Sequence, residues 1–350
     1  MKLGFVLPGV CIAAKGGVPV QARMWKEGLE KNGDVVEMIS PWGEYEWESF
    51  DYIVVFGIGQ LLLGYVTLLH QYPNIKIVSA PIIDFPKSVK EYRFRAKYFG
   101  SVKYKVNRPL HDLYYARNLF DFFLARSEHE KKYIVEGLGV EADKVEIVPL
   151  SMRFSDTLPE VNLQSKENFC LHVSRLSFWG KNVERLIEAA KKYNFQLKLA
   201  GSLFGKGDKE WLDNLIKDAP NIEYVGFLSE EDLRKYYNRA RVFALPSIVE
   251  GVGFVALEAA VYGAEIVLTD IGAPKEYYDG RAYLVSPYDV DAIGGAIVKA
   301  LNEHKAQPEL RNYILNNYSF DVLSKKLHQV FQKRLSLIPQ HYSLTLFISA

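Results

Sequence analysis

The sequence predicts an α/β fold with two doubly wound domains, each built on a parallel sheet that helices cover on both faces. Its length of 350 residues exceeds the roughly 250–300 residues at which one hydrophobic core stops growing. In both halves, short apolar runs alternate with longer segments of helical period. The short runs are apolar throughout, which is typical of strands buried on both faces of a parallel sheet.

The first half contains six strand-like runs separated by helical stretches. In chain order they are LGFVL, VVEMI, YIVVFG, KIVSA, FFLA and VEIVP. Strands that alternate with helices predict a parallel, doubly wound sheet. We assign this sheet to a first domain over residues 1–152.

The second half repeats the same plan. Its runs are FCLHVS, LKLAG, IEYVG, VFALPS, AEIVLTD and AYLVS, which predict a second domain over residues 166–319. Residues 153–165 contain prolines and serines without a clear period, as expected of a linker. A last helical pattern lies within residues 320–350, which we expect to pack back on the first domain.

Two segments resemble membrane signals. The first fourteen residues have a lysine and an apolar stretch, but Pro8 and Gly9 interrupt them and no charged cluster precedes them, so we expect a buried first strand. Residues 52–70 have nearly the length of a membrane span. Gly57 and Gly59 divide that segment into a strand-sized and a helix-sized part, which favours strand, turn and helix.

Composition indicates an ordinary globular protein. The chain carries 43 basic and 42 acidic residues with 49% hydrophobic content, so its global charge does not argue for nucleic-acid binding. Its two cysteines, Cys11 and Cys170, lie far apart in apolar runs. We expect core residues rather than a disulfide or a metal site, and a reducing cytoplasmic location fits.

The most informative motif is EGVGFVALE, which Glu250 and Glu258 bracket. Gly251 and Gly253 allow backbone amides to approach a ligand, and a helix-forming stretch follows. This arrangement suits an anion at a helix N-terminus with a carboxylate at each end. The same residues also fit a purely structural role, because glutamates near helix starts complement the helix dipole.

Two more loops follow strands, where doubly wound sheets bind ligands. Gly16 and Gly17 precede a helix opened by Pro19, which suits either an anion site or a plain tight turn. Arg175 and Lys181 lie six positions apart in a polar loop. A guanidinium and an ammonium group are the usual pair for a diphosphate, although solvated loop charges are the common alternative.

These loops, in this order, resemble the family-four retaining glycosyltransferases of the GT-B fold. The resemblance covers nearly the whole chain and implies a nucleotide-sugar site in the cleft between the two domains. The segments that carry it are GGVPVQ, SEHEKKYIVEGLGVEADKVEIVP, VSRLSFWGKN, AGS, YVGFLSEEDLRKYYNRARVFALPS, EGVGFVALEAAVYG and DIGAPKEYYDGRAYLVSPYDVDAI.

The resemblance implies roles for the charged residues of the motifs. Arg175 and Lys181 would bind the donor diphosphate and stabilise the departing nucleoside diphosphate. Glu258 would hold the ribose diol, and Glu250 would lie against the donor sugar. Fixed cations aimed at a leaving group that gains negative charge act mainly in the transition state.

The resemblance also implies roles for backbone groups. The amides of Gly253, Phe254 and Val255 would contact the diphosphate or the sugar, and Gly16 and Gly17 would close over it from the first domain. Neither a metal ion nor another cofactor is implied, and the nucleotide diphosphate sugar enters as the donor substrate.

The chain departs from the family on the acceptor side. Many members carry a histidine after the fourth strand of the first domain, where this chain has KIVSAPIIDFPKS. Asp84 is the candidate substitute, or it caps a turn before Pro86, while we expect His70 at the surface. The family's asparagine and glycine after the last strand of this domain are replaced by PLSMRF.

Residues 87–117 contain nine basic residues, two acidic residues and seven aromatic residues. This mixture suits an anionic membrane surface or a lipid-linked phosphate. A solvated helical face with its aromatic rings packed inward is the alternative. Single-stranded nucleic acid would use the same chemistry, but nothing else in the sequence supports it.

Taken together, we expect a metal-independent retaining hexosyltransferase that uses a nucleotide diphosphate sugar. Its acceptor would be a glycan or a lipid-linked molecule in surface polysaccharide or glycolipid synthesis, at the inner face of the membrane. The alternatives are a catalytically silent nucleotide-sugar or glycan-binding protein of the same fold, and a nucleotide-sugar epimerase or glycan phosphorylase.

Overall fold

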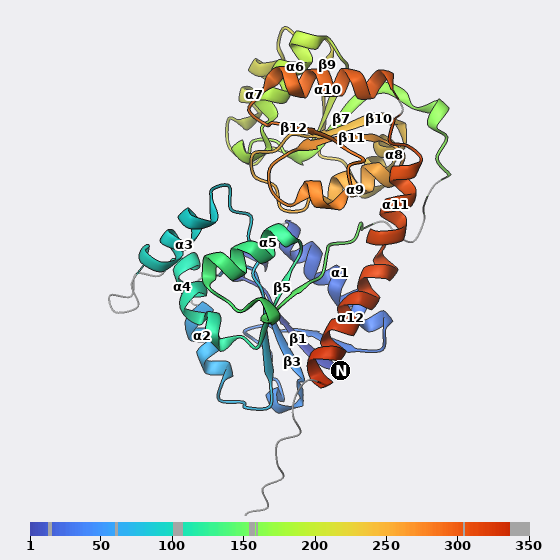
Figure 1. Ribbon diagram of the computed structural model, residues 1–350. Coiled ribbons are helices and arrows are strands. Elements are labelled where there is room, and N and C mark those ends of the chain that lie inside the picture. The colour runs from blue at the N-terminus through green and yellow to red at the C-terminus, as the bar shows by residue number, and fades with distance from the viewer. Residues whose placement is uncertain are drawn as a thin grey trace, which may run out of the picture.

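The computed structural model describes residues 1–12, 16–59, 62–100, 108–153, 158, 160–303 and 305–336. Parts of five predicted segments lie outside these residues: 13–14 in the first apolar stretch, 60–61 in the segment 52–70, 101–107 in the basic and aromatic stretch, most of 154–159 in the linker, and 337–350 in the last segment. Figure 1 shows two α/β domains stacked one above the other, with the first domain below.

The first domain contains a six-stranded sheet in the order β2-β1-β3-β4-β5-β6, and all of its strand pairs are parallel. Its strands are β1 (Lys2–Val6), β2 (Val35–Met38), β3 (Tyr52–Phe56), β4 (Lys76–Ala80), β5 (Phe122–Ala125) and β6 (Val145–Ile147). Its helices are α1 (Gly17–Lys31), α2 (Leu62–Leu69), α3 (Val89–Tyr98), α4 (Pro109–Ala116) and α5 (Glu128–Lys132).

The second domain contains another parallel six-stranded sheet, in the order β12-β11-β10-β7-β8-β9. Its strands are β7 (Glu167–Arg175), β8 (Leu197–Ser202), β9 (Ile222–Gly226), β10 (Ala240–Leu245), β11 (Glu265–Thr269) and β12 (Tyr283–Val285). Its helices are α6 (Val183–Tyr193), α7 (Asp208–Ile216), α8 (Glu230–Arg239), α9 (Phe254–Val261), α10 (Val290–Asn302) and α11 (Glu309–Tyr318). The predicted fold class is therefore confirmed, with all twelve strands in the expected runs.

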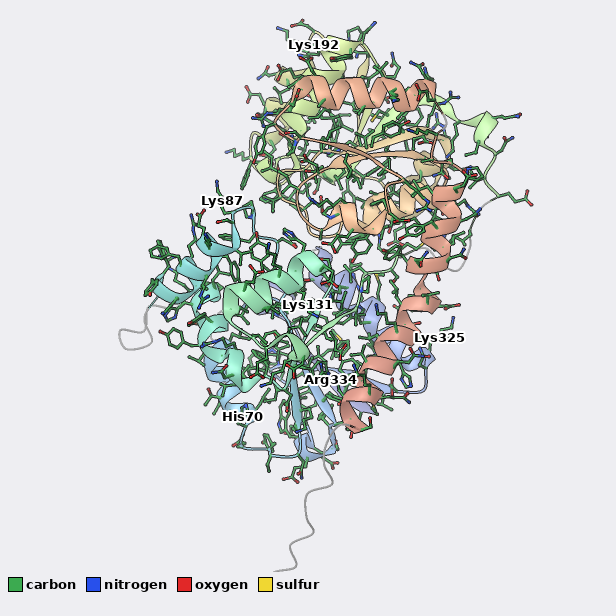
Figure 2. All side chains as sticks on the ribbon, in the orientation of Figure 1. His70, Lys87, Lys131, Lys192, Lys325 and Arg334 are labelled. Carbon is green, nitrogen blue, oxygen red and sulfur yellow. The ribbon has the colours of Figure 1, made fainter. Side chains whose placement is uncertain are left out.

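The last helix, α12 (Phe320–Ser336), leaves the second domain and runs beside α1 of the first (Figure 1). The hydroxyl of Tyr52 on β3 donates to the carbonyl of Phe331, 2.9 Å away. Arg334, labelled near the lower end of this helix in Figure 2, forms an ion pair of 2.9 Å with Glu146. The chain thus crosses between the domains twice, and the two crossings touch where the amide of Met152 donates to the carbonyl of Tyr318, 3.3 Å away.

The hydrophobic core follows the alternation of side chains along each strand. On β3, the side chains of Tyr52, Val54 and Phe56 belong to a cluster on one face of the sheet. Those of Ile53 and Val55 belong to a separate cluster on the other face. The first of these clusters continues into the second domain and includes Leu257 of α9, so buried apolar contacts join the two domains.

The apolar segment over residues 52–70 divides as predicted. A fully buried strand, β3, is followed by the short helix α2. Among the residues that the structure describes, no helix is both long enough and apolar enough to cross a membrane.

Candidate functional site

Glu250 lies in the loop between β10 and α9, and this loop contacts the turn Trp179–Lys181. The amides of Ile248 and Val249 donate to the carbonyl of Gly180 at 2.8 and 3.0 Å. Lys181 Nζ then reaches Glu250 Oε2 at 2.7 Å. The hydroxyl of Ser247 donates to the same oxygen at 3.1 Å. Within the described residues, no hydrogen bond is made to Glu250 Oε1, so this oxygen is available to a ligand.

Helix α9 begins directly beyond the second glycine of the motif. Gly253 caps it with φ +69°, a left-handed conformation that side chains strain and glycine adopts freely. The first amides of a helix have no acceptor within the helix. No acidic residue occupies the first turn of α9, and no side chain caps it. The amides at Gly253, Phe254 and Val255 therefore offer a site for an anion.

Glu258 lies one turn further along α9 and is only 1% exposed. Arg153 Nε and Nη2 donate to its two oxygens at 2.6 and 2.9 Å, and the hydroxyl of Tyr237 donates at 3.1 Å. Burial alone lowers the pKa of Arg153, but its hydrogen bonds to Glu258 and the charge of that carboxylate raise it above its ordinary value. The carboxylate expected to hold a ribose diol is thus covered by an arginine in this structure.

Arg175 and Lys181, the two predicted phosphate-binding cations, differ in environment. Arg175 ends β7 and is exposed. Its guanidinium carbon lies 5.2 Å from the centroid of the Phe204 ring, and in the described part of the chain it forms no ion pair. Lys181 is already paired with Glu250. Arg175 is therefore the more accessible cation of the two.

The glycine turn of the first domain faces α9. Gly17 starts α1, and a Cβ built on it would lie 3.9 Å from the ring of Phe254. A Cβ on Gly16 would meet nothing within 4 Å, so Gly16 borders open space. Gly17 therefore lies beside Phe254, the first residue of α9.

Asp84 meets the same motif from the first domain. A Cβ built on Gly251 would lie 2.7 and 2.9 Å from its two carboxylate oxygens. Its Oδ1 accepts a hydrogen bond of 2.6 Å from Arg126 Nη2. The structure therefore gives Asp84 an ion pair, rather than the cap of a turn, and holds it against the loop that carries Glu250.

Arg126, which the sequence did not single out, is buried and fixed by Glu130. Glu130 accepts hydrogen bonds from Arg126 Nε at 2.8 Å, from the Arg126 amide at 2.7 Å and from the Ile83 amide at 2.6 Å. Burial alone lowers the pKa of Arg126, but the neighbouring Asp84 and Glu130 carboxylates raise it above its ordinary value. This buried network fixes the position of Asp84.

A pocket of about 250 Å³ lies between the domains beside these groups. Its lining residues come from both domains: Ile83, Asp84, Phe85, Pro86, Lys87, His129, Tyr133, Ile248, Val249, Glu250, Gly251, Ile271 and Gly272. Asp84 and Glu250 thus meet at one cavity, which Arg175, Lys181 and Glu258 do not line.

His129 is the second functional candidate that the sequence reasoning missed. Its ring lies 5.1 Å from that of Tyr133. Burial and then the charge of Lys275 lower its pKa, so the imidazole is neutral at pH 7. It follows the end of β5 by four positions, so the rule that ligand groups follow strand ends would have found it.

Hydrogen bonds across the domains fix the backbone at His129. Glu276 accepts hydrogen bonds of 2.8 Å from the amides of Glu128 and His129 at the start of α5. The next residue, Tyr277, donates from its hydroxyl to the Arg126 carbonyl at 2.6 Å. Burial raises the pKa of the Glu276 carboxyl. The second domain therefore caps a helix of the first.

Comparison with known proteins finds glycosyltransferases among the relatives of this chain. Residues 154–317 match the family described as glycosyl transferases group 1. An uncharacterized glycosyltransferase of Methanocaldococcus jannaschii is 29% identical over 196 residues, which cover 51% of this chain and 48% of that protein. The O-antigen chain mannosyltransferase RfbU of Salmonella typhimurium is 27% identical over 195 residues, or 55% of this chain and 54% of that protein. The chain thus spans about half the length of these curated relatives.

Solved structures resemble the whole fold. Sucrose-phosphate synthase from Thermosynechococcus elongatus superposes with a TM-score of 0.75 at 17% identity, covering 96% of this chain and 99% of that one. Anabaena HepE in complex with UDP superposes with a TM-score of 0.72 at 14% identity, covering 95% and 100%. These similarities confirm the predicted GT-B architecture.

Proposed function

We propose that the chain is a metal-independent retaining glycosyltransferase, because residues 154–317 match the family described as glycosyl transferases group 1. It moves a hexose from a nucleotide diphosphate sugar to a glycan or lipid-linked acceptor. One observation carries this proposal: groups from both domains lie together at the start of α9. The second domain supplies Glu250, paired with Lys181, and the first amides of the helix. The first domain supplies Asp84 and Gly17.

The relatives support a role in surface polysaccharide synthesis. Two of them are O-antigen chain mannosyltransferases, from Escherichia coli and Salmonella typhimurium. HepE, which shares the fold, has been solved with UDP-glucose. A nucleotide-activated hexose is therefore the proposed donor, and the cytoplasmic face of a membrane is the proposed place of action.

The chemistry follows from charge. As the bond from C1 of the sugar to the diphosphate breaks, the leaving diphosphate gains negative charge, which Arg175, Lys181 and the α9 amides stabilise. The acceptor hydroxyl attacks C1 from the face that the diphosphate leaves, so the configuration is retained. Its proton passes to a diphosphate oxygen. Glu250 orients the sugar through its available oxygen.

Glu258 takes the ribose in this proposal, which requires an exchange of partners. Arg153 covers both oxygens of Glu258, and its guanidinium carbon lies 5.2 Å from the ring centroid of Phe254 at the start of α9. Donor binding would replace the guanidinium by the two ribose hydroxyls. Arg153 would then be a competitor of the donor for Glu258.

Helix α3 is the proposed membrane contact. Tyr92 and Ala96 are buried against the domain, whereas Phe94, Tyr98 and Phe99 are 54%, 60% and 56% exposed. The exposed rings pack on one another, with basic side chains interspersed among them: Lys90, Arg93 and Lys97. Exposed aromatic rings among cations suit the interface of an anionic bilayer.

Release of nucleoside diphosphate tests the proposed activity. Purified protein is incubated with labelled uridine, guanosine or adenosine diphosphate sugars and a crude lipid extract, without added metal and with chelator. We expect one donor to give product with a retained anomeric configuration. A catalytically silent sugar-nucleotide-binding protein, which the absent family histidine favours, would release no nucleoside diphosphate above background.

Vesicle sedimentation tests the membrane contact. We expect binding to phosphatidylglycerol vesicles but not to phosphatidylcholine vesicles, and the double variant Phe94→Ser, Tyr98→Ser should lose it. A matched control is Tyr288→Ser, since that ring is 57% exposed on the second domain. Equal binding by the two variants would contradict the assignment to α3.

A further inference from the structure

The pocket between the domains presents one carboxylate from each domain. Asp84 and Glu250 line it from opposite domains, and each already has a cation partner, at 2.6 Å from Arg126 and 2.7 Å from Lys181. Within the described ranges, Asp84 Oδ2 and Glu250 Oε1 accept no hydrogen bond. Two carboxylate oxygens therefore remain for donors supplied by a ligand.

His129 adds a neutral group to this lining. Its position is set by its backbone, since its amide donates to Glu276 at 2.8 Å. In the part of the chain that the structure describes, its ring nitrogens form no hydrogen bond. A neutral imidazole both donates and accepts one hydrogen bond, which matches a hydroxyl group. Lys87, the cation that lines the same pocket, is exposed and remains hydrated at the rim.

Size restricts the ligand further. The volume of about 250 Å³ lies below the roughly 300–1,000 Å³ of pockets that enclose drug-sized molecules. A single pyranose ring suits such a space. Several of its hydroxyls would donate to the free oxygens of Asp84 and Glu250.

We propose that this pocket selects a neutral, hydroxyl-bearing sugar ring over an anionic one, with His129 and Asp84 as its specificity-determining residues. The inference rests on the proposed function and names the sugar class of that site. A carboxylate or phosphate on the ring would place negative charge against the carboxylates of Asp84 and Glu250. It would also leave their free oxygens without donors, and such unpaired polar groups discriminate strongly between ligands. The ring belongs either to the donor or to the acceptor.

The donor arm uses calorimetry with matched nucleotides. The Kd of UDP, UDP-glucose and UDP-glucuronate is measured for the wild type, His129→Ala and Asp84→Asn, and again with GDP and GDP-mannose. We expect the neutral sugar to tighten binding relative to the bare nucleotide. In each variant the Kd of the neutral nucleotide sugar should rise about 3- to 10-fold, while the Kd of UDP and of GDP should not change. Glucuronate should give no gain in the wild type.

The acceptor arm uses free methyl glycosides. Saturation-transfer NMR measures binding of methyl mannoside, methyl glucoside and methyl glucuronide to the protein saturated with nucleoside diphosphate. If the ring belongs to the acceptor, the neutral glycosides show transfer that both variants weaken, and the glucuronide shows none.

The control is His70→Gln, because His70 lies after α2 at the far side of the first domain in Figure 2 and bonds only the Leu119 carbonyl among the described residues. It should match the wild type in both arms. Equal binding of neutral and anionic sugars, or unchanged sugar binding in both variants, would overturn the proposal. If the wild type binds none of the nucleotides, the result counts against the proposed function. The methyl glycoside experiment would then be the test of sugar selection by the pocket.

Discussion

The two sides of the pocket between the domains are built in different ways. On the second-domain side, Glu250 and Gly251 line the pocket from one loop, which leads directly to α9. On the first-domain side, Asp84 follows β4 and His129 lies in α5, and Arg126 pairs with both Asp84 and Glu130. The second-domain side is one continuous segment of the sequence, whereas the first-domain side joins residues as far apart as Asp84 and Arg126, 42 positions from each other. We therefore expect substitutions on the second-domain side to change mainly catalysis, and substitutions in the first-domain network to change mainly stability.

The largest expected effect is on the stability of the first-domain network. Arg126→Met leaves the buried Glu130 without its partner, which typically costs about 3–5 kcal/mol. Urea unfolding measures the change. Arg95→Met is the matched control, because Arg95 pairs with Glu91 at the same four-residue spacing but with both side chains at least 36% exposed. There the loss should stay below about 1 kcal/mol, and similar losses in the two variants would contradict the comparison.

On the second-domain side, the expected effect falls on catalysis. Glu250→Gln removes the charge beside the sugar and should lower transfer about 100- to 1000-fold, the range for a lost transition-state contact. The unfolding midpoint should stay near that of the wild type. Glu231→Gln on the outer face of α8, 81% exposed, is the control with unchanged turnover. Nearly full transfer activity in the Glu250 variant would remove it from the reaction.

Acid should weaken the second domain through His172. This side chain on β7 is fully buried, and its pKa is lowered to about 4, from an ordinary value of 6.5, chiefly by burial. The neutral form is the stable one in the fold, so its contribution is present above pH 6.5 and is lost as the pH falls toward 4. The difference corresponds to about 3 kcal/mol.

Urea unfolding between pH 7 and pH 4 checks this expectation. The free energy of unfolding should fall less steeply with acid in His172→Gln than in the wild type. His70→Gln should follow the wild-type curve, since His70 is exposed. Parallel curves for wild type and His172→Gln would show that this histidine does not titrate on unfolding.

The smallest expected effect concerns the nucleotide end of the site. Arg153→Gln should tighten binding of the donor nucleoside diphosphate about tenfold, because Glu258 no longer exchanges a charged hydrogen-bond partner for the ribose. Calorimetry measures it. Arg239→Gln is the control, since Arg239 makes a similar two-point contact with Glu167 at the surface. Weaker binding by the Arg153 variant would instead make this arginine part of the donor site.

The fold was predictable because its signals are local. Each strand is a short apolar run, and each loop that follows one is near it in sequence, which is how the motif from Glu250 to Glu258 and the glycine turn at Gly17 were found. The partners of these residues are not local. Arg126 lies 42 positions from Asp84, and Arg153 lies 105 positions from Glu258.

The amide of His129 lies 147 positions from the Glu276 carboxylate that holds it. Such pairs depend on how the domains meet, which no local pattern encodes. For that reason the sequence did not reveal Arg126, Arg153 or the hydrogen bonds from the α5 amides to Glu276. The roles assigned to Arg175, Lys181 and Glu250 in the donor site remain predictions, and the Glu250→Gln variant tests the last of them.

The return of α12 to the first domain has a consequence for protein engineering. Because the side chains and backbone of this helix bond Tyr52 and Glu146, the first domain is completed by residues that follow the second in the chain. A chimera with a single junction in the linker would therefore replace the first domain without replacing α12, the helix that completes it. Grafting a new acceptor half onto this donor half requires two junctions, near Met152 and Tyr318, where the crossing segments already touch.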